Sequence, residues 1–465
     1  MNSFTLHGLI LVLFAAIATR ASANTYYIDF SSGSDRNAGL STSSPWKLAP
    51  GMTGFAASYR HAAGDKFIFK GGVTWPATVL PLNIKLSGAA GNPDVYASDQ
   101  SWYGGAHWTP PILDGAQKGI TLLNINASNL TFSNFHLQNV GLLNTADRFK
   151  AVVIVESQNL DFNHNIVDCA CWIGVIYGTQ SGGTLQNINI HDNEISNAGM
   201  AIVVSTGAPG SVLNNVQIHD NTVHDLSSKI GDWVHGDGIH VWGGPDDTQY
   251  VSNLKIYNNL FYGKFARAFS NTGGMTAYIY IEDATTGALM YNNVASSSDP
   301  PQQPAFGALI MIRGHAARGG GHLIANNTVR GTAKGSNAAV LLYDSPNSSI
   351  KNNILAGTSE AYIAMDRLTT QGTTIDYNDP WTSNPASLVG EWPDYTKFDW
   401  KAWRAAGRDL HGIAKDPLFF SPTDSHLQPA SPCKRAGVNL SQFFSADKDG
   451  HPRPSSAPWS VGAYQ

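Results

Sequence analysis

Charged residues are scarce in this sequence. They make up 14% of its 465 residues, whereas soluble proteins average about 25%. The formal net charge is −5, so the chain lacks the basic surface that nucleic-acid binding needs to neutralise phosphates. We therefore expect no nucleic-acid partner.

Long apolar runs are also missing. The run from Leu9 to Thr19 is shorter than the about 20 apolar residues that cross a bilayer. It is followed by Ala21-Ser22-Ala23, a pattern of small residues typical of a signal-peptidase site. We predict a cleaved signal peptide over residues 1–23, a mature protein that is secreted or periplasmic, and no membrane partner.

Cysteine is rare, with three residues in the chain: Cys169, Cys171 and Cys433. Three cysteines cannot all pair within one chain, and their spacing does not match the Cys-x-x-Cys pattern of zinc sites. We expect them to serve as small buried apolar side chains.

Asparagine, serine and glycine are abundant, and one phrase recurs in which an alternating strand precedes an asparagine. Alternation of this kind predicts half-buried strands. Strands that cannot bury one face alone must stack on their neighbours. The recurring asparagines, 26 to 38 residues apart, are Asn165, Asn193, Asn221, Asn259, Asn293, Asn327 and Asn353.

Stacked repeats of this composition predict an all-β, single-stranded, right-handed parallel β-helix. Each recurring asparagine is expected to occupy the same turn on every coil, where it tolerates a left-handed backbone and hydrogen-bonds to the next coil. Leucine-rich and helical solenoids are excluded, because neither a leucine period nor a helical pattern is present. We predict an N-terminal capping segment over 24–115, the β-helix over 116–375, and a Trp-rich C-terminal cap over 376–465.

Both ends of the chain carry motifs of one protein group. The motifs are Tyr26-Tyr-Ile-Asp29, Gly64-Asp65, Asp416-Pro417, Asp449-Gly450 and Val461-Gly462-Ala-Tyr464. With them, the sequence resembles the secreted right-handed β-helix proteins that include pectate lyases, related polysaccharide lyases, glycoside hydrolases and epimerases. The resemblance implies an exported carbohydrate-active protein, but one scaffold can host many chemistries.

A second strand in each coil predicts where the chemistry is located. If Val241 and Ile281 point inward, alternation sends the neighbouring side chains outward in two columns. The first column then contains His240, Tyr280, Met311 and Leu341, and the second contains Trp242, Glu282, Arg313 and Tyr343.

The segment 232–242 concentrates polar and aromatic residues beside these columns, including His235, Asp237, His240 and Trp242. Stacked coils do not need such residues, whereas a saccharide cleft uses aromatic rings and polar groups. For Asp237 the Gly-Asp-Gly context equally indicates an ordinary turn.

Positive charge follows on the next coils, at Arg267, Arg313 and His315. Paired hydrogen bonds from arginine suit the carboxylate of a uronate sugar. The structural alternative for Arg313 is a salt bridge with Glu282. Together with Trp242, His235 and Tyr343, these residues are our predicted substrate-binding set.

The segments His191-Asp192-Asn193-Glu194 and His219-Asp220-Asn221 suggest that carboxylates on adjacent coils could share calcium. They belong to the repeated ladder strand rather than to the predicted groove. We therefore interpret them as structural and assign no cofactor.

We predict a monomeric enzyme that cleaves a uronate-containing polysaccharide by β-elimination, with His240 as base and Tyr280 as acid. A uronate epimerase would use the same groups. An inverting glycoside hydrolase is the main alternative. Asp237, Glu282 and Asp283 are its available acids, and the separation expected between Asp237 and Glu282 suits inversion. A non-catalytic glycan-binding protein is the third alternative.

Overall fold

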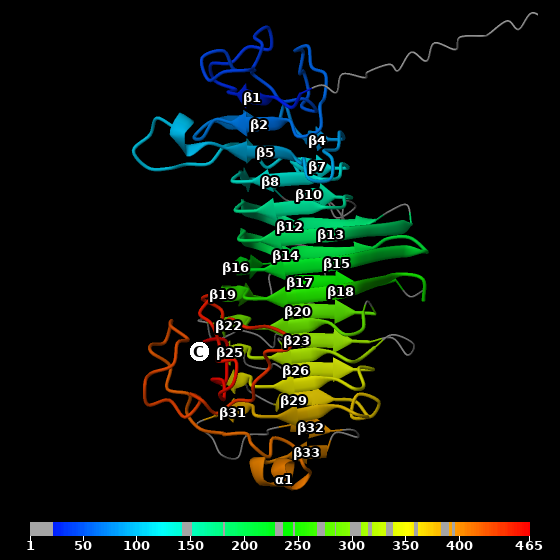
Figure 1. Ribbon diagram of the computed structural model, residues 1–465, viewed down its shortest axis with the longest axis vertical. Helices are drawn as coiled ribbons and strands as arrows, with labels where there is room; N and C mark the ends of the chain where they lie inside the picture. The colour runs from blue at the N-terminus through cyan, green and yellow to red at the C-terminus, as the bar shows by residue number, and fades with distance from the viewer. Residues whose placement is uncertain are drawn as a thin grey trace, which may run out of the picture.

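The computed structural model of the protein describes residues 22–141, 151–179, 182–227, 236–244, 247–266, 275–283, 285–297, 308–314, 319–331, 338–357, 361–382, 390–392 and 396–465. Within these ranges the chain forms an elongated stack of parallel strands (Figure 1). The predicted signal peptide lies almost wholly outside the described residues, as do His235, Arg267 and His315.

The first sheet has twelve strands, one from each successive coil. They are β1 (Thr25–Ile28), β2 (Lys66–Phe69), β5 (Asp94–Ser98), β8 (Leu130–Ser133), β11 (Leu160–Asn163), β13 (Gly183–His191), β15 (Ser211–His219), β18 (Tyr250–Tyr257), β21 (Leu289–Tyr291), β24 (Leu323–Ala325), β27 (Ser349–Lys351) and β30 (Thr374–Asp376).

The remaining strands form two further ladders that share the long strands β12 (Ile166–Thr179) and β14 (Glu194–Thr206). The middle ladder adds β3 (Thr74–Pro76), β6 (Ile112–Asp114), β9 (His136–Gln138), β16 (Thr222–Ser227), β19 (Leu260–Ala266), β22 (Val294–Ser297), β25 (Thr328–Arg330), β28 (Ile354–Ala356) and β31 (Asp379–Trp381). The third ladder adds β4 (Leu82–Ile84), β7 (Leu123–Ile125), β10 (Ala151–Val155), β17 (Gly236–Trp242), β20 (Met275–Glu282), β23 (Ala308–Arg313), β26 (Ala338–Tyr343), β29 (Ala361–Met365), β32 (Gly390–Trp392) and the antiparallel β33 (Thr396–Phe398).

The chain visits the three ladders in turn and advances by one strand at each visit, which defines a parallel β-helix and confirms the predicted fold class. Parallel pairing already begins at β1 and β2, within the range predicted to form the N-terminal cap. Inward side chains such as Val241 and Ile281 are at most 1% exposed and fill the interior.

A row of buried asparagine side chains joins the coils at the turn between the first sheet and the middle ladder. From Asn193 onward, each side-chain oxygen accepts the backbone N–H and one side-chain N–H of the asparagine one coil earlier, at 2.9 to 3.1 Å. The oxygen of Asn165 accepts the backbone N–H of Phe135 instead. The row contains every asparagine predicted and one more, Asn378. The predicted hydrogen bonding is therefore confirmed.

The expected left-handed backbone of these asparagines is wrong. The residue just before each one has the positive φ, as in Asp192 (52°), Asp220 (53°) and Asn258 (56°). The ladder side chain points inward, so the sharp turn must be made by its outward neighbour.

The row ends at Asp409, beside the helix α1 (Trp400–Ala405), which lies at the end of the stack (Figure 1). One carboxylate oxygen of Asp409 accepts the backbone N–H and a side-chain N–H of Asn378. The other oxygen accepts the indole N–H of the buried Trp403 at 3.0 Å. A short 3₁₀ turn, η1 (Gln100–Trp102), lies near the other end.

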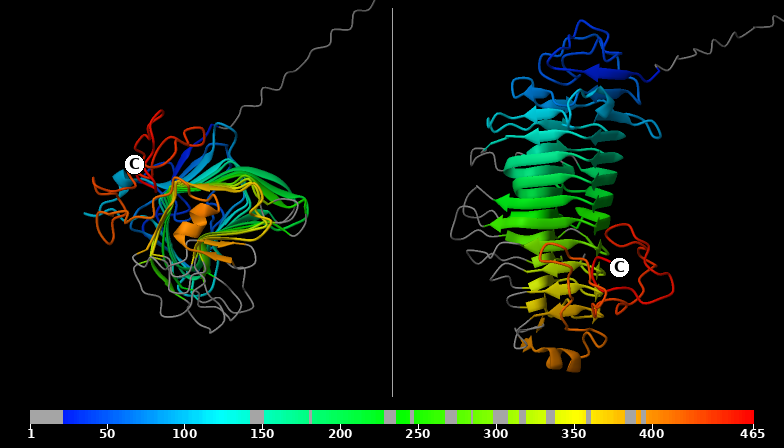
Figure 2. Two further views of the ribbon diagram at one scale, coloured as in Figure 1. Left: turned by 90° about the horizontal axis from the view of Figure 1, so that it is seen from below. Right: turned by 90° about the vertical axis from the view of Figure 1, so that its left-hand side faces the viewer.

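The C-terminal segment folds back along the flank of the coils (Figure 2). Its backbone carbonyls at Ser460 and Gly462 accept the side-chain N–H groups of Asn326, each at 2.9 Å. The guanidinium of the buried Arg453 donates to Asn292 one coil earlier, also at 2.9 Å. The segment thereby joins several coils along one corner.

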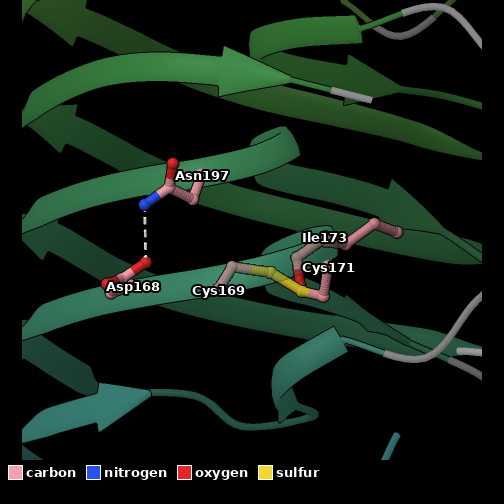
Figure 3. Close-up of a disulfide and its surroundings, with 5 residues drawn as sticks. All are labelled: Asp168, Cys169, Cys171, Ile173 and Asn197. Atoms are coloured by element: carbon pink, nitrogen blue, oxygen red, sulfur yellow. Dashed lines mark hydrogen bonds between the residues drawn. A yellow bond between two sulfur atoms is a disulfide. The ribbon is translucent and has the colours of Figure 1, made fainter. Parts of the chain in front are cut away.

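All three cysteines are buried, as predicted, but two of them are not free thiols. A disulfide joins Cys169 and Cys171 in β12, where the strand pairing shifts register (Figure 3). The sequence expectation is corrected here, because a bulge shortens the distance between the two residues: their Cα atoms are 4.9 Å apart, whereas residues i and i+2 of a regular strand are about 6.6 Å apart. Cys433 is a buried free thiol that donates to Asp379 at 3.0 Å.

Candidate active site

The strand register confirms both outward columns on the third ladder. His240 pairs with Tyr280, and Tyr280 with Met311. Trp242 pairs with Glu282, which pairs with Arg313, which pairs with Tyr343. Four coils therefore bring together residues that are about a hundred positions apart in the sequence.

A continuous chain of polar contacts crosses three of these coils. His240 Nδ1 lies 3.4 Å from Asp237 Oδ2, and His240 Nε2 lies 3.4 Å from Glu282 Oε2. Arg313 Nη2 lies 2.9 Å from Glu282 Oε1 and 2.9 Å from Asp283 Oδ2. The salt bridge considered from the sequence exists, and it is part of a larger acid–histidine–arginine cluster.

Gly238, between Asp237 and His240 in β17, packs closely against its neighbours. A Cβ atom at this position would lie 2.4 Å from the carbonyl oxygen of Tyr278 and 2.6 Å from the ring of Phe261. Only glycine fits this close approach. The side chain of Asp237 is fully buried there, and it also accepts the backbone N–H of Ala277 at 3.3 Å.

The cluster is mostly shielded from solvent. His240 is 8% exposed and its ring stacks on that of Tyr280, 4.8 Å between centroids. Burial and the nearby charge of Glu282 hold the pKa of Tyr280 well above its ordinary value. Tyr280 therefore keeps its proton at neutral pH.

Glu282 and Arg313 are charged. Burial alone would raise the pKa of Glu282, but its contact with His240 and the charge of Arg313 bring that pKa below its ordinary value. The hydrogen bond from Arg313 to Asp283 raises the pKa of the guanidinium further. Arg313 is half exposed, and its Nη1 and Nε groups make no hydrogen bond to the described residues.

Two further acids lie at the edge of the cluster, of which Asp283 is one of the carboxyls considered from the sequence for hydrolysis, whereas Asp344 has no predicted role. Asp283 shares Arg313 with Glu282, and Asp344 lies two coils along at the same register, both with a left-handed backbone. Burial, followed by the charge of Asp366, raises the pKa of Asp344. Their shared position, directly after an outward aromatic or acidic residue of the third ladder, was the available signal.

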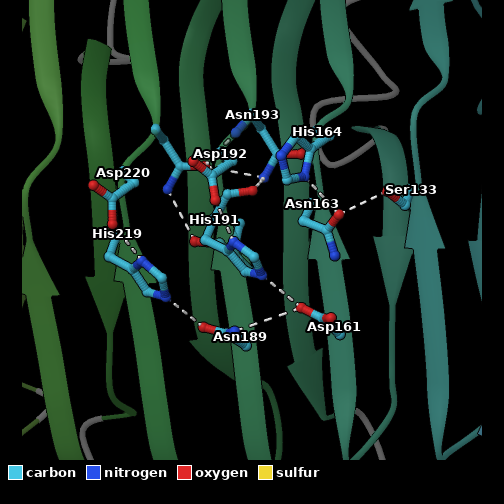
Figure 4. Close-up of polar contacts among 12 residues, drawn as sticks. Ser133, Asp161, Asn163, His164, Asn189, His191, Asp192, Asn193, His219 and Asp220 are labelled. Atoms are coloured by element: carbon cyan, nitrogen blue, oxygen red, sulfur yellow. Dashed lines mark hydrogen bonds and ion pairs between the residues drawn. The ribbon is translucent and has the colours of Figure 1, made fainter. Parts of the chain in front are cut away.

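The histidines of the two histidine-rich segments, His191 and His219, end strands β13 and β15 of the first sheet (Figure 4), whereas the cluster lies on the third ladder. His191 contacts Asp192 at 2.6 Å and Asp161 at 2.7 Å, and its ring stacks on His219. Among the described residues, no group of three or more His, Cys, Asp or Glu side chains is placed to hold a metal ion. The contacts are those of a structural network.

We expect the stabilisation from His191 to depend on pH. Burial alone would lower the pKa of His191, but its bonds to Asp161 and Asp192 raise that pKa. This stabilisation is complete below the unfolded pKa of about 6.5 and is lost as the pH rises through the higher folded pKa. Burial would raise the pKa of Asp161, but its hydrogen bonds to His191 and to two asparagines, together with the charge of His191, lower that pKa below its ordinary value. The stabilisation contributed by Asp161 is therefore lost in acid, as the pH falls below about 3.9.

Melting curves of the wild type and His191→Gln across pH measure this dependence. The difference in Tm should be largest between about pH 4 and 6.5 and should shrink on the alkaline side. A difference that stays constant from acid to alkali would contradict the paired-charge interpretation.

The topology places the protein in the class of parallel β-helices, and comparison with known proteins adds likenesses of fold. No protein-family model and no curated protein matches the sequence. Solved structures that resemble it include pectate lyase Pel9A (14% identity, 96% of this chain and 97% of that chain, TM-score 0.45). XylC in complex with xylose also resembles it (10% identity, 94% and 98%, TM-score 0.49).

A third similar structure is the GH136 lacto-N-biosidase from Eubacterium ramulus (12% identity, 80% of this chain and 68% of that chain, TM-score 0.42). The parallel β-helix that the sequence resemblance implied is the fold shown by the strand topology. The three similarities are likenesses of fold, and no residue role follows from them. Within the described ranges, no helix is both long and apolar enough to cross a membrane.

Proposed function

We propose that the protein is a carbohydrate-active enzyme that cleaves a uronate-containing polysaccharide by β-elimination. The observation that carries the proposal is the placement of a histidine, a protonated tyrosine and a half-exposed arginine within one cluster on the third ladder. Elimination needs these three functions, namely a base, an acid and a cation.

Each step can be assigned to one of these groups. The half-exposed guanidinium of Arg313 pairs with the uronate carboxylate through an N–H group other than Nη2, and this acidifies the neighbouring C5–H. His240, oriented by Asp237, removes that proton. The electrons form the C4=C5 double bond, the C4–O bond breaks, and Tyr280 protonates the leaving oxygen.

A glycoside hydrolase is the second candidate, because carboxylates outnumber cations in the cluster. Asp237 and Glu282 contact opposite nitrogens of one imidazole. Because the imidazole ring lies between the two carboxyl groups, their separation is closer to the about 6.5–9.5 Å of inverting enzymes than to the about 5 Å of retaining enzymes. The complete burial of Asp237 disfavours it as a group that touches substrate.

Product chemistry separates the two reactions. We expect incubation with polygalacturonate or alginate to give new reducing ends together with ultraviolet absorbance from the unsaturated product. Reducing ends without absorbance would replace the proposal by hydrolysis. If neither signal appears, two possibilities remain. One is epimerisation, which proton exchange at C5 would reveal, and the other is binding without catalysis.

We also propose that the protein is exported. The disulfide between Cys169 and Cys171 supports this, because such bonds persist in oxidising compartments. The apolar run ahead of Ala21-Ser22-Ala23 agrees with it.

A further inference from the structure

Two aromatic side chains lie on either side of the charged pair in the outer column. Along the stack the order is Trp242, Glu282, Arg313 and Tyr343, each on the next coil. Trp242 is 36% exposed and Tyr343 is 38% exposed, which places both among the most exposed large apolar or aromatic residues of the described chain.

The neighbouring column has the opposite character. His240, Tyr280 and Leu341 are each less than a tenth exposed. A ligand on this face therefore meets the outer column first, with rings at both ends and opposite charges between them. Sugar rings present apolar faces that pack on aromatic rings, and their acidic groups pair with arginine.

The spacing of the outer column determines how long a sugar chain it can hold. Adjacent strands are about 4.8 Å apart, so three steps separate Trp242 from Tyr343 by about 14 Å. A sugar unit in an extended chain advances by about one strand spacing. A chain of four units lying along the column would place one unit on each of the four side chains.

We infer that Trp242 and Tyr343 are the two ends of a four-unit binding track, so that the protein cleaves within chains and discriminates by chain length. This inference rests on the proposed function and deepens it. Units over Trp242 and Tyr343 hold the chain, and the cleaved bond is next to the unit bound by Arg313. A dimer reaches one aromatic ring at most and is held poorly.

The test measures kcat/KM on oligogalacturonides from the dimer to the hexamer. For the wild type we expect kcat/KM to rise steeply up to the tetramer and then level off. Trp242→Ala and Tyr343→Ala should each lower kcat/KM on the tetramer by about tenfold, the scale of a buried aromatic contact. Their effect on the dimer should be far smaller.

Tyr262→Ala is the matched control. Tyr262 is also 38% exposed and stacks on a histidine, His224, but it belongs to the middle ladder. This variant should follow the wild type at every length. A kcat/KM independent of chain length, or equal losses in the three variants, would overturn the inference while leaving the reaction intact.

A binding measurement keeps the track testable if no probe is cleaved. Native electrophoresis through gels that contain polygalacturonate, alginate or xylan should retard the wild type and Tyr262→Ala in at least one gel. In that gel Trp242→Ala and Tyr343→Ala should migrate faster. This outcome would retain the track and reject the reaction, whereas no retardation of the wild type in any gel would overturn the track itself.

Discussion

His240→Gln is expected to lower kcat by about a thousandfold, within the range of a lost general acid–base group. His240 lies between Asp237 and Glu282 and stacks on Tyr280, so it is the group to which the rest of the cluster connects. Glutamine keeps polar atoms in the space but cannot accept and release a proton near neutral pH. KM should change much less than kcat, since the glycan contacts of the outer column remain.

The chain contains a close control for this variant. His224 also lies between two carboxylates, those of Glu194 at 3.2 Å and Asp225 at 2.8 Å, and stacks on a tyrosine. It belongs to the middle ladder. His224→Gln should keep full kcat, and an equal loss in both variants would mean that the histidines act through the fold. Retention of activity in His240→Gln would remove this histidine from the reaction.

Asn259→Ala is expected to destabilise the protein by about 3 kcal/mol or more. The side chain of Asn259 accepts two N–H groups from Asn221 and donates to the carbonyl of Ile218 and to Asn293. Alanine leaves these buried partners unsatisfied, at about 1–3 kcal/mol for each group. Thermal melting should show the loss as a clearly lower Tm.

Asn253→Gly in the same coil is the control. Asn253 is exposed, has a left-handed backbone (φ 51°) and makes a side-chain bond to Asn214. Glycine adopts that backbone without strain, so the Tm should change little. Equal losses of Tm in both variants would show that a buried asparagine of the row stabilises the protein no more than a surface asparagine does.

The stacking and the strand register could be predicted from the sequence, because repetition constrains both. Alternation in strands β17 and β20 fixed which residues face outward, and a slip of one residue would have exposed Val241 and Ile281. The neighbours of Glu282 on both adjacent strands followed from the same pattern.

Contacts between side chains on different coils were harder to predict. The sequence does not show that Arg313 shares its charge between Glu282 and Asp283, because Asp283 lies beyond the strand in a left-handed turn. The disulfide of β12 was missed for a related reason. Two cysteines at i and i+2 share one face of a regular strand but lie about 6.6 Å apart along it, and the bulge brings their Cα atoms to 4.9 Å.

The asparagine row also has a direction. Every side-chain amide accepts with its oxygen from the coil before it and donates one N–H group to the next side chain of the row, while its other N–H group returns to a carbonyl of the coil before it. The bonds between successive amides therefore all run the same way along the stack. Such a row behaves like the aligned peptide dipoles of a helix, with its positive end toward the C-terminus. Asp409, which has acceptors and no donors, closes that end. An added coil could therefore be inserted anywhere before Asp409, but none could follow it without a new terminator.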